Sequence, residues 1–270
     1  MTELTVMSFN IRYGDAPDAE NAWSFRTDAV IAMLAEQRPA LLGLQEAMGY
    51  QIDAIRNAFP QYGFIGRGHL TGSYSEEHAA ILFDQQALSP LQHDTFWYAD
   101  TPEQPGSKSW GNDIPRTCSW AQFLWKSAKQ TFRIYNSHWD HEQEALRERS
   151  AQQLLQQISR QVTTKDPVVV LGDFNCGESA PAFRKLLSSD DLALRDSYRL
   201  IHPNATDVGS FHQFTGSRIG EKVDAILVSP HWQVKAAEII SGKFLQRYPS
   251  DHFPVTATLS LVQSHSKGLD

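Results

Sequence analysis

Apolar and polar residues alternate along the chain in two patterns, one typical of strands and one typical of amphipathic helices. The clearest helical pattern has apolar residues at 151, 154, 155, 158 and 162, the spacing of one buried stripe. Short runs rich in β-branched and aromatic residues predict strands. The predicted helices cover residues 25–37, 51–59, 151–162 and 180–187, and the predicted strands cover residues 4–12, 40–45, 62–67, 79–83, 88–97, 117–125, 132–138, 168–171, 223–228, 232–240 and 255–261.

The order of these elements indicates an α/β protein. Strand and helix alternate over the first sixty residues, and a β-rich stretch follows from residue 62. Residues 98–115 form a long loop rich in Pro, Gly and Trp, a length typical of functional or disordered loops. The sequence contains no internal repeat, low-complexity tract or linker-like break, so we expect a single domain over residues 1–270.

The stretch DPVVVLGDFN, residues 166–175, is the most informative of the predicted strands. Three valines and a leucine predict a buried strand that runs directly into Gly172. Gly allows the backbone to turn sharply there, and ligands of open α/β sheets bind at the carboxyl ends of the strands. Asp173 and Asn175 are two residues apart and can point to the same side. Alone, this pair is also explained by an Asx-turn that ends a strand.

Charge and composition narrow the class of protein. The chain has 24 Lys and Arg against 31 Asp and Glu, a net charge of −7, which disfavours extended nucleic acid as a partner. It does not exclude nucleic acid, because a bound divalent cation reverses the local potential. The sequence has neither 18 uninterrupted apolar residues nor a basic N-terminal region before an apolar core. We therefore expect a cytoplasmic protein without signal peptide, membrane insertion or obligate protein partner.

Six separated stretches place ligand-type polar residues at a predicted strand end or in the adjacent loop. These residues are Asn10, Glu46, His138 with Asp140, Asp173 with Asn175, Asp224, and Asp251 with His252. A single Asp or Asn at such a position is usually a turn or cap residue. Turn chemistry alone does not explain six occurrences, which indicate a functional site.

This ordered set of motifs resembles the endonuclease/exonuclease/phosphatase superfamily of metal-dependent phosphohydrolases. The similarity extends from about residue 4 to residue 261, and the combination of GDFN with SDH near the last strand is its most specific part. The resemblance implies a four-layer α/β sandwich, in which two mixed β-sheets pack face to face with helices on the outside. It also implies hydrolysis of phosphoester bonds.

The resemblance further implies a divalent cation. Oxygen ligands with few dedicated protein donors suit Mg²⁺ or Mn²⁺, which retain water and take substrate oxygens as ligands. Glu46 matches the principal metal ligand of the family, with Asn10 beside it. Asp251 is expected as a further or water-mediated ligand.

The resemblance also implies catalytic roles for the remaining residues of the set. Asp173 is expected to orient or deprotonate the attacking water, and Asn175 to hold water or phosphate. His252 would contact the phosphate, aligned by a hydrogen bond to Asp224. His138 would donate to the phosphate or to the leaving group. As ordinary alternatives, Asp224 is a buried strand acid and Asp140 opens the following helix.

Residues 95–120 resemble a subfamily of bacterial metal-dependent hydrolases, which suggests the substrate contacts. Arg116 and Arg147 match recurrent positions there, and a guanidinium binds phosphate oxygens bidentately; a surface ion pair is the alternative for Arg116. Glu77 is a weaker match, because the family's Gly-Glu pair is Glu-Glu here. Trp110 could stack on a sugar or base ring, although loop anchoring explains it as well.

The predicted function is metal-dependent hydrolysis, as a phosphodiesterase or phosphatase, of a small or medium phosphorylated substrate. A nuclease acting on RNA or DNA is the first alternative, and it requires a basic groove that sequence cannot show. A non-catalytic phospholigand-binding protein is the second. The presence of Glu46, Asp173, Asn175, Asp251 and His252 argues against this last reading, since such proteins typically lose a metal ligand or the base.

Overall fold

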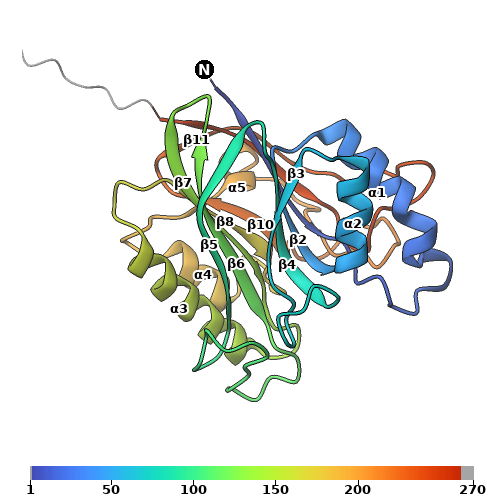
Figure 1. The fold of residues 1–270 in the computed structure, drawn as a ribbon, viewed down its shortest axis with the longest axis horizontal. Coiled ribbons are helices and arrows are strands. Elements are labelled where there is room, and N and C mark those ends of the chain that lie inside the picture. Colours follow the sequence, from blue (N-terminus) through green and yellow to red (C-terminus); the bar gives the residue numbers. More distant parts are fainter. Residues whose placement is uncertain (1, 263–270) are drawn as a thin grey trace, which may run out of the picture.

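The computed structural model describes residues 2–262, and their strands form two sheets of six strands each (Figure 1). In spatial order, the first sheet contains β11 (Trp232–Ile239), β12 (Val255–Leu261), β1 (Leu4–Asn10), β2 (Leu41–Met48), β4 (Glu77–Asp84) and β3 (Tyr62–Ile65). The second contains β5 (Leu88–Trp97), β6 (Thr117–Trp125), β7 (Gln130–His138), β8 (Val168–Asp173), β10 (Asp224–Val228) and β9 (Arg195–Asp196). Both sheets are mixed, because β1 pairs with β2 and β7 with β8 in parallel, while the other pairs are antiparallel.

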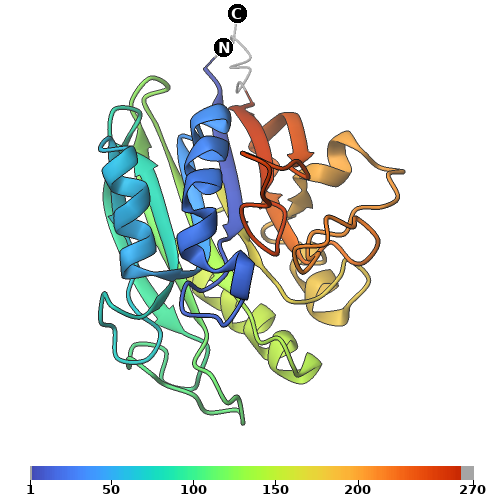
Figure 2. The same ribbon diagram turned by 90° about the vertical axis from the view of Figure 1, so that its right-hand side faces the viewer.

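Helices cover the outer face of each sheet. The helices are α1 (Trp23–Gln37), α2 (Gly49–Ala58), α3 (Glu144–Gln161), α4 (Pro181–Leu187) and α5 (Ser197–Ile201), with a short 3₁₀ turn η1 (Ala19–Asn21). Apolar residues of α1 and α2 pack on the first sheet, and those of α3 and α4 pack on the second (Figures 1 and 2). The predicted four-layer α/β sandwich is therefore confirmed.

The main core lies between the two sheets. Side chains such as Leu41 and Ile81 from the first sheet meet Ile134, Leu171 and Ile226 from the second, and all are at most 1% exposed. Each buried aliphatic side chain of this kind contributes about 1.5–3 kcal/mol relative to an exposed one. This core explains why β8 is apolar at every position before Gly172: one face packs between the sheets and the other packs under α3 and α4.

The two parallel strand pairs place polar residues together where the strands end, at one end of the sandwich. In the second sheet, His138 pairs with Asp173 across β7 and β8, and Asp173 pairs with Asp224 across β8 and β10. In the first sheet, Asn10 ends β1 beside Gln45 of β2. Because the sheets lie face to face, these ends meet, and the amide of Asn10 reaches Asp173 at 2.9 Å.

The structure differs from the sequence prediction at β2. This strand does not end at residue 45 but continues to Met48, with a shift of register between Leu44 and Ala47. Glu46 lies in this irregularity with φ of 59°. Bulges of this kind redirect a side chain without ending the strand, so Glu46 points to the site from within β2. The short elements β9, α5 and η1 were not predicted.

Within residues 2–262, no helix is both long and apolar enough to cross a membrane.

Candidate active site

Asp173 lies at the centre of the polar cluster. Its side chain is 1% exposed, and its Oδ2 atom accepts a hydrogen bond of 2.9 Å from Asn10 Nδ2. The Nε2 atoms of His138 and His252 lie 3.7 and 3.8 Å from the same oxygen. These distances are too long for direct hydrogen bonds, so an oxygen atom of a ligand can hydrogen-bond to the carboxylate and to an imidazole. Burial and the neighbouring Asp224 raise the pKa of Asp173 to about 7.

His252 is fixed by Asp224. Its Nδ1 atom lies 2.9 Å from Asp224 Oδ2, and both side chains are buried. Burial alone would lower the pKa of His252, but the carboxylates of Asp224 and Asp173 outweigh it and raise that pKa well above its usual value. The hydrogen bond also sets the ring orientation and leaves Nε2 facing Asp173.

His138 has the opposite electrostatic environment. Burial and the adjacent guanidinium of Arg116 lower its pKa well below the usual range. Nη1 of Arg116 lies 3.2 Å from both ring nitrogens of His138, and Nη2 lies 2.8 Å from His141 Nδ1. Arg116 Nε is buried and has no hydrogen-bond partner among the described residues. An unpaired buried donor on a cation, next to a neutral imidazole, is suited to an anion.

Two of the three predicted metal ligands, Asn10 and Glu46, contact each other beside Asp173, and the third, Asp251, lies near Arg12. Asn10 Nδ2 donates to Glu46 Oε1 at 2.9 Å, and Glu46 Oε2 accepts from the backbone N–H of Tyr13 at 2.9 Å. Asp251 is 5% exposed, and burial raises its pKa. The Nε atom of Arg12 lies 3.7 Å from Asp251 Oδ2. The amide oxygen of Asn10 accepts the backbone N–H of Arg12 at 3.0 Å, so the carboxylates of Glu46 and Asp251 are the oxygen donors that fit Mg²⁺ or Mn²⁺ best.

A second group in the structure has the spacing of a metal site. One ligand atom each from Asp173, Asp224 and His252 lie within 4.8 Å of one another. His252 Nδ1 is already hydrogen-bonded to Asp224, so only Nε2 is free. The Oδ1 atom of Asp224 is buried without a partner among the described residues. We interpret this trio as a positioned imidazole next to a carboxylate, and the Glu46 cluster as the better fit for a hard cation.

Other predicted residues support the loops around the cluster. The backbone N–H of Asn175 donates to Asp173 Oδ1, and its Nδ2 donates to the carbonyl of Trp139. Asp140 Oδ1 accepts the N–H groups of residues 142 and 143 just before α3, which agrees with the alternative that it opens the helix. Arg147 is engaged with Glu144 and with the carbonyl of Asp140.

A narrow cleft leads to His138 and Arg116. Glu46, Glu77 and His69 line it from the first sheet and its loops. Burial and the charge of Glu46 raise the pKa of Glu77 to about 7. Trp110 is not brought to this cleft, because its Nε1 donates to Asp100 and the Arg149 guanidinium lies 5.6 Å from its ring centroid, in a separate groove.

Sequence reasoning missed one aromatic residue of the site. Phe211 forms an isolated β-bridge with His252, and their ring centroids are 4.8 Å apart. The Phe211 side chain is nevertheless 41% exposed, so one part of its ring faces solvent beside the imidazole. No periodicity marks Phe211 in the sequence, since it lies in a loop between α5 and β10.

Comparison with known proteins identifies the family. The sequence matches the Endonuclease/Exonuclease/phosphatase family over residues 7–252. The chain belongs to this family. Members of the family are phosphoesterases, so membership supports an enzyme of phosphoester hydrolysis.

Solved structures of the Endonuclease/Exonuclease/phosphatase family superpose on the whole sandwich. A family protein from Bacteroides thetaiotaomicron has 28% sequence identity and a TM-score of 0.86, covering 97% of this chain and 99% of its own. The mannosyl-6-phosphatase Bt3783 of Bacteroides thetaiotaomicron has 28% identity and a TM-score of 0.84, covering 96% of this chain and all of its own. The uncharacterized protein L388 of Acanthamoeba polyphaga mimivirus is 27% identical over 160 residues, which span 57% of this chain and 59% of that relative.

Proposed function

We propose that this enzyme hydrolyses a small phosphorylated substrate, with a sugar phosphate as the first candidate, and that it requires Mg²⁺ or Mn²⁺. The observation that carries the proposal is the convergence of His138 and His252 on the carboxylate of Asp173. The similarity to a mannosyl-6-phosphatase along the full length of both chains supports the sugar phosphate.

Each residue at this edge has a task in the proposed reaction. Asp173 orients the attacking water and accepts its proton, and its own position is held by Asn10 and by the N–H of Asn175. His138 and His252 donate their Nε2 hydrogens to phosphoryl oxygens, where negative charge grows in the transition state. Arg116 binds the phosphate with its Nε donor, for which residues 2–262 supply no partner.

Glu46, Asn10 and Asp251 would hold the divalent cation. The cation would neutralise charge on the phosphoryl oxygens and stabilise the leaving oxygen. Asn10 donates to both Glu46 and Asp173, so the same amide orients the cation ligand and the base.

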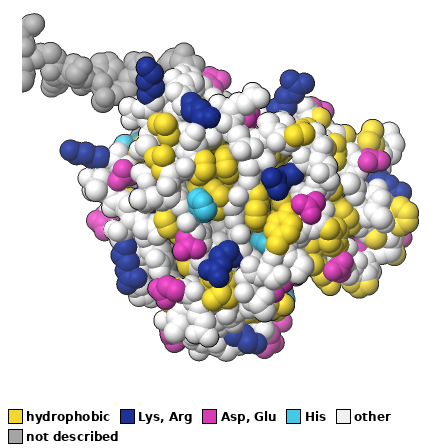
Figure 3. Space-filling view, in the orientation of Figure 1, with side chains coloured by type: hydrophobic (Ala, Val, Ile, Leu, Met, Phe, Trp, Pro, Cys, Tyr) yellow, Lys and Arg dark blue, Asp and Glu magenta, His cyan; other side chains and the backbone are white. Residues whose placement is uncertain are grey.

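The surface charge favours a small substrate over a polynucleotide. On the face shown in Figure 3, Lys and Arg side chains are scattered singly among Asp and Glu and form no continuous stripe. Phosphate backbones bind through many Lys and Arg contacts, and the net charge of −7 supplies no general attraction. Phe211, exposed beside His252, offers an apolar face to a substrate ring.

The proposal is tested by a hydrolysis panel with the wild-type chain and with Asp173→Ala, each with Mg²⁺, with Mn²⁺ or with EDTA. The substrates are p-nitrophenyl phosphate, bis-p-nitrophenyl phosphate, several sugar phosphates and nucleotides, and single-stranded RNA and DNA. We expect chelator-sensitive hydrolysis of small esters, untouched polynucleotide, and a loss of at least about a thousand-fold in kcat for Asp173→Ala.

The panel also contains the outcomes that contradict the proposal. Degradation of RNA or DNA in preference to small esters would replace it with a nuclease. Near-normal turnover by Asp173→Ala, in a variant whose melting temperature matches wild type, would remove Asp173 from its assigned role.

A further inference from the structure

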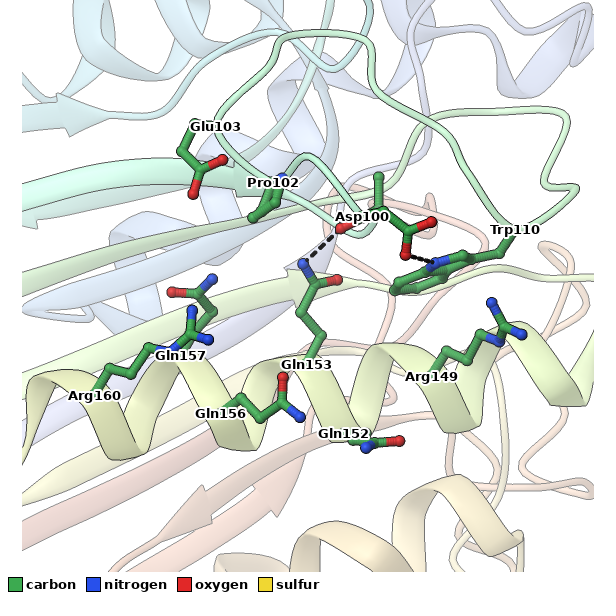
Figure 4. Close-up of a pocket in the computed structure, with 11 residues that line it drawn as sticks. Asp100, Pro102, Glu103, Trp110, Arg149, Gln152, Gln153, Gln156, Gln157 and Arg160 are labelled. Carbon is green, nitrogen blue, oxygen red and sulfur yellow. Dashed lines mark hydrogen bonds between the residues drawn. The ribbon is translucent and has the colours of Figure 1, made fainter.

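A polar groove runs along α3, away from the catalytic cleft. Its floor is the exposed side of α3 and its opposite wall is the segment from Ala99 to Trp110 (Figure 4). Its volume is about 600 Å³, within the range of small-ligand sites. No residue that lines the catalytic cleft also lines this groove.

Four glutamine side chains line the helix side of the groove. Gln152, Gln153, Gln156 and Gln157 follow one another along α3, because positions i, i+1, i+4 and i+5 share one side of a helix. Each amide offers two donor hydrogens and an acceptor oxygen. An amide therefore complements two neighbouring hydroxyl groups of a ligand, since a hydroxyl group also donates and accepts hydrogen bonds.

One amide is rigid and incompletely satisfied. Gln153 Nε2 donates to the carbonyls of Ala99 at 2.9 Å and of Trp97 at 3.3 Å, so the side chain is fixed against the opposite wall. Its Oε1 atom is buried and has no partner among the described residues. An acceptor in this position takes a hydrogen bond from a ligand or from water.

The charged groups of the groove balance one another. Arg149 and Arg160 lie at its two ends, and Asp100 and Glu103 lie on the opposite wall. Asp100 is already bonded to Trp110 Nε1 at 2.7 Å, and Arg149 lies over the Trp110 ring. Two cations and two anions give no net attraction for a polyanion, whereas a neutral polar ligand has no charge to desolvate.

From this lining we infer that the groove along α3 is a binding site for a neutral glycan, with Gln153 and its neighbouring amides hydrogen-bonding to sugar hydroxyls beside Trp110. The Trp110 ring is anchored by its Nε1, which donates to Asp100, and it offers a sugar ring the apolar surface that the Arg149 guanidinium leaves uncovered. The site binds its ligand without hydrolysis and is independent of Asp173.

The test is ligand-observed NMR of wild-type protein with three unphosphorylated trisaccharides, namely mannotriose, maltotriose and cellotriose. We expect saturation transfer to at least one of them, with a dissociation constant on the order of 1 mM. Gln156→Leu keeps the size of the side chain and removes its hydrogen-bonding groups, and it should weaken binding by about ten-fold or more. Gln161→Ala removes an amide of the same helix outside the groove and should bind like wild type.

The same samples separate this inference from the proposed function. Asp173→Ala should bind the trisaccharide like wild type although it does not hydrolyse bis-p-nitrophenyl phosphate. Absence of saturation transfer from all three sugars, or unchanged binding by a folded Gln156→Leu variant, would overturn the glycan site whatever the result of the hydrolysis assay.

Discussion

Removing the charge of Asp224 is the sharpest test of how the imidazole of His252 is used. Asp224→Asn preserves the shape of the side chain and can still accept a hydrogen bond from Nδ1, but it no longer carries a negative charge. The two side chains are 2.9 Å apart and buried, so solvent cannot compensate for the loss. Asp224 acts through His252 and is therefore a positioning residue.

The expected magnitude follows from this contact. A buried hydrogen bond to a charged group contributes about 1.5–3 kcal/mol. If that contribution is expressed in the transition state, kcat falls by about ten- to a hundred-fold, since 1.36 kcal/mol corresponds to a factor of ten. KM should change little, because the phosphate still contacts Arg116 and His138.

A double-mutant cycle measures whether the loss passes through His252. kcat for bis-p-nitrophenyl phosphate is compared in wild type, Asp224→Asn, His252→Ala and the double variant, below the lowest melting temperature of the four. In the His252→Ala background, Asp224→Asn should cost less than about two-fold, because the interaction is already absent. Equal losses in both backgrounds would refute the assignment, because Asp224 would then act independently of His252, as its effect on the pKa of Asp173 allows.

Three further predictions concern the rim of the site and the stability of the fold. Phe211→Ala should raise KM for sugar phosphates several-fold, because the ring contact is lost, but leave KM for methyl phosphate, which has no ring, unchanged. Equal effects on both substrates would contradict a ring contact. Lys222 is 1% exposed and lies 2.6 Å from Asp196. Asp196→Asn leaves the ammonium buried and Lys222→Met leaves the carboxylate buried, so each should destabilise the protein by about 3–5 kcal/mol in urea unfolding. Hydrogen bonds from Arg199 and the charge of Lys222 outweigh burial and lower the pKa of Glu178, the other acid of this cluster. Its stabilisation is therefore complete above pH 4.5 and is lost on acidification below that value, a dependence that Glu178→Gln should reduce.

The strands were predictable where their patterns are long. The predicted ranges 88–97, 117–125 and 255–261 coincide with β5, β6 and β12. A continuous buried face marks β6 and β12, whereas β5 is buried only at its two ends. β9 has two residues and α5 has five, too few for any periodicity to appear. The extension of β2 through Glu46 was also invisible, since a bulge depends on the partner strand and not on local sequence.

The site was predictable as far as it depends on strand ends. His138, Asp173 and Asp224 lie side by side because three neighbouring strands are in register, which follows once the strands are ordered. Trp110 and Phe211 lie in loops, where sequence gives no direction for a side chain. The structure therefore separates Trp110 from the catalytic cleft and brings the unpredicted Phe211 against His252.

Backbone strain gives an independent reason to place function at this edge. Arg12, Glu46 and Asn175 have φ of 59°, 59° and 49°, the left-handed region that only glycine adopts without cost. Such positions cost roughly 1 kcal/mol or more each for other residues. A fourth left-handed residue, Gln213, also borders the site, because its backbone N–H donates to the carbonyl of Asp251. At two of these positions the side chain makes hydrogen bonds within the site: Glu46 accepts from Asn10 and from a backbone N–H, and Asn175 donates to a carbonyl. Glycine at these positions would remove the strain but also the side-chain contacts. The strained backbone is therefore retained where the site needs the side chain.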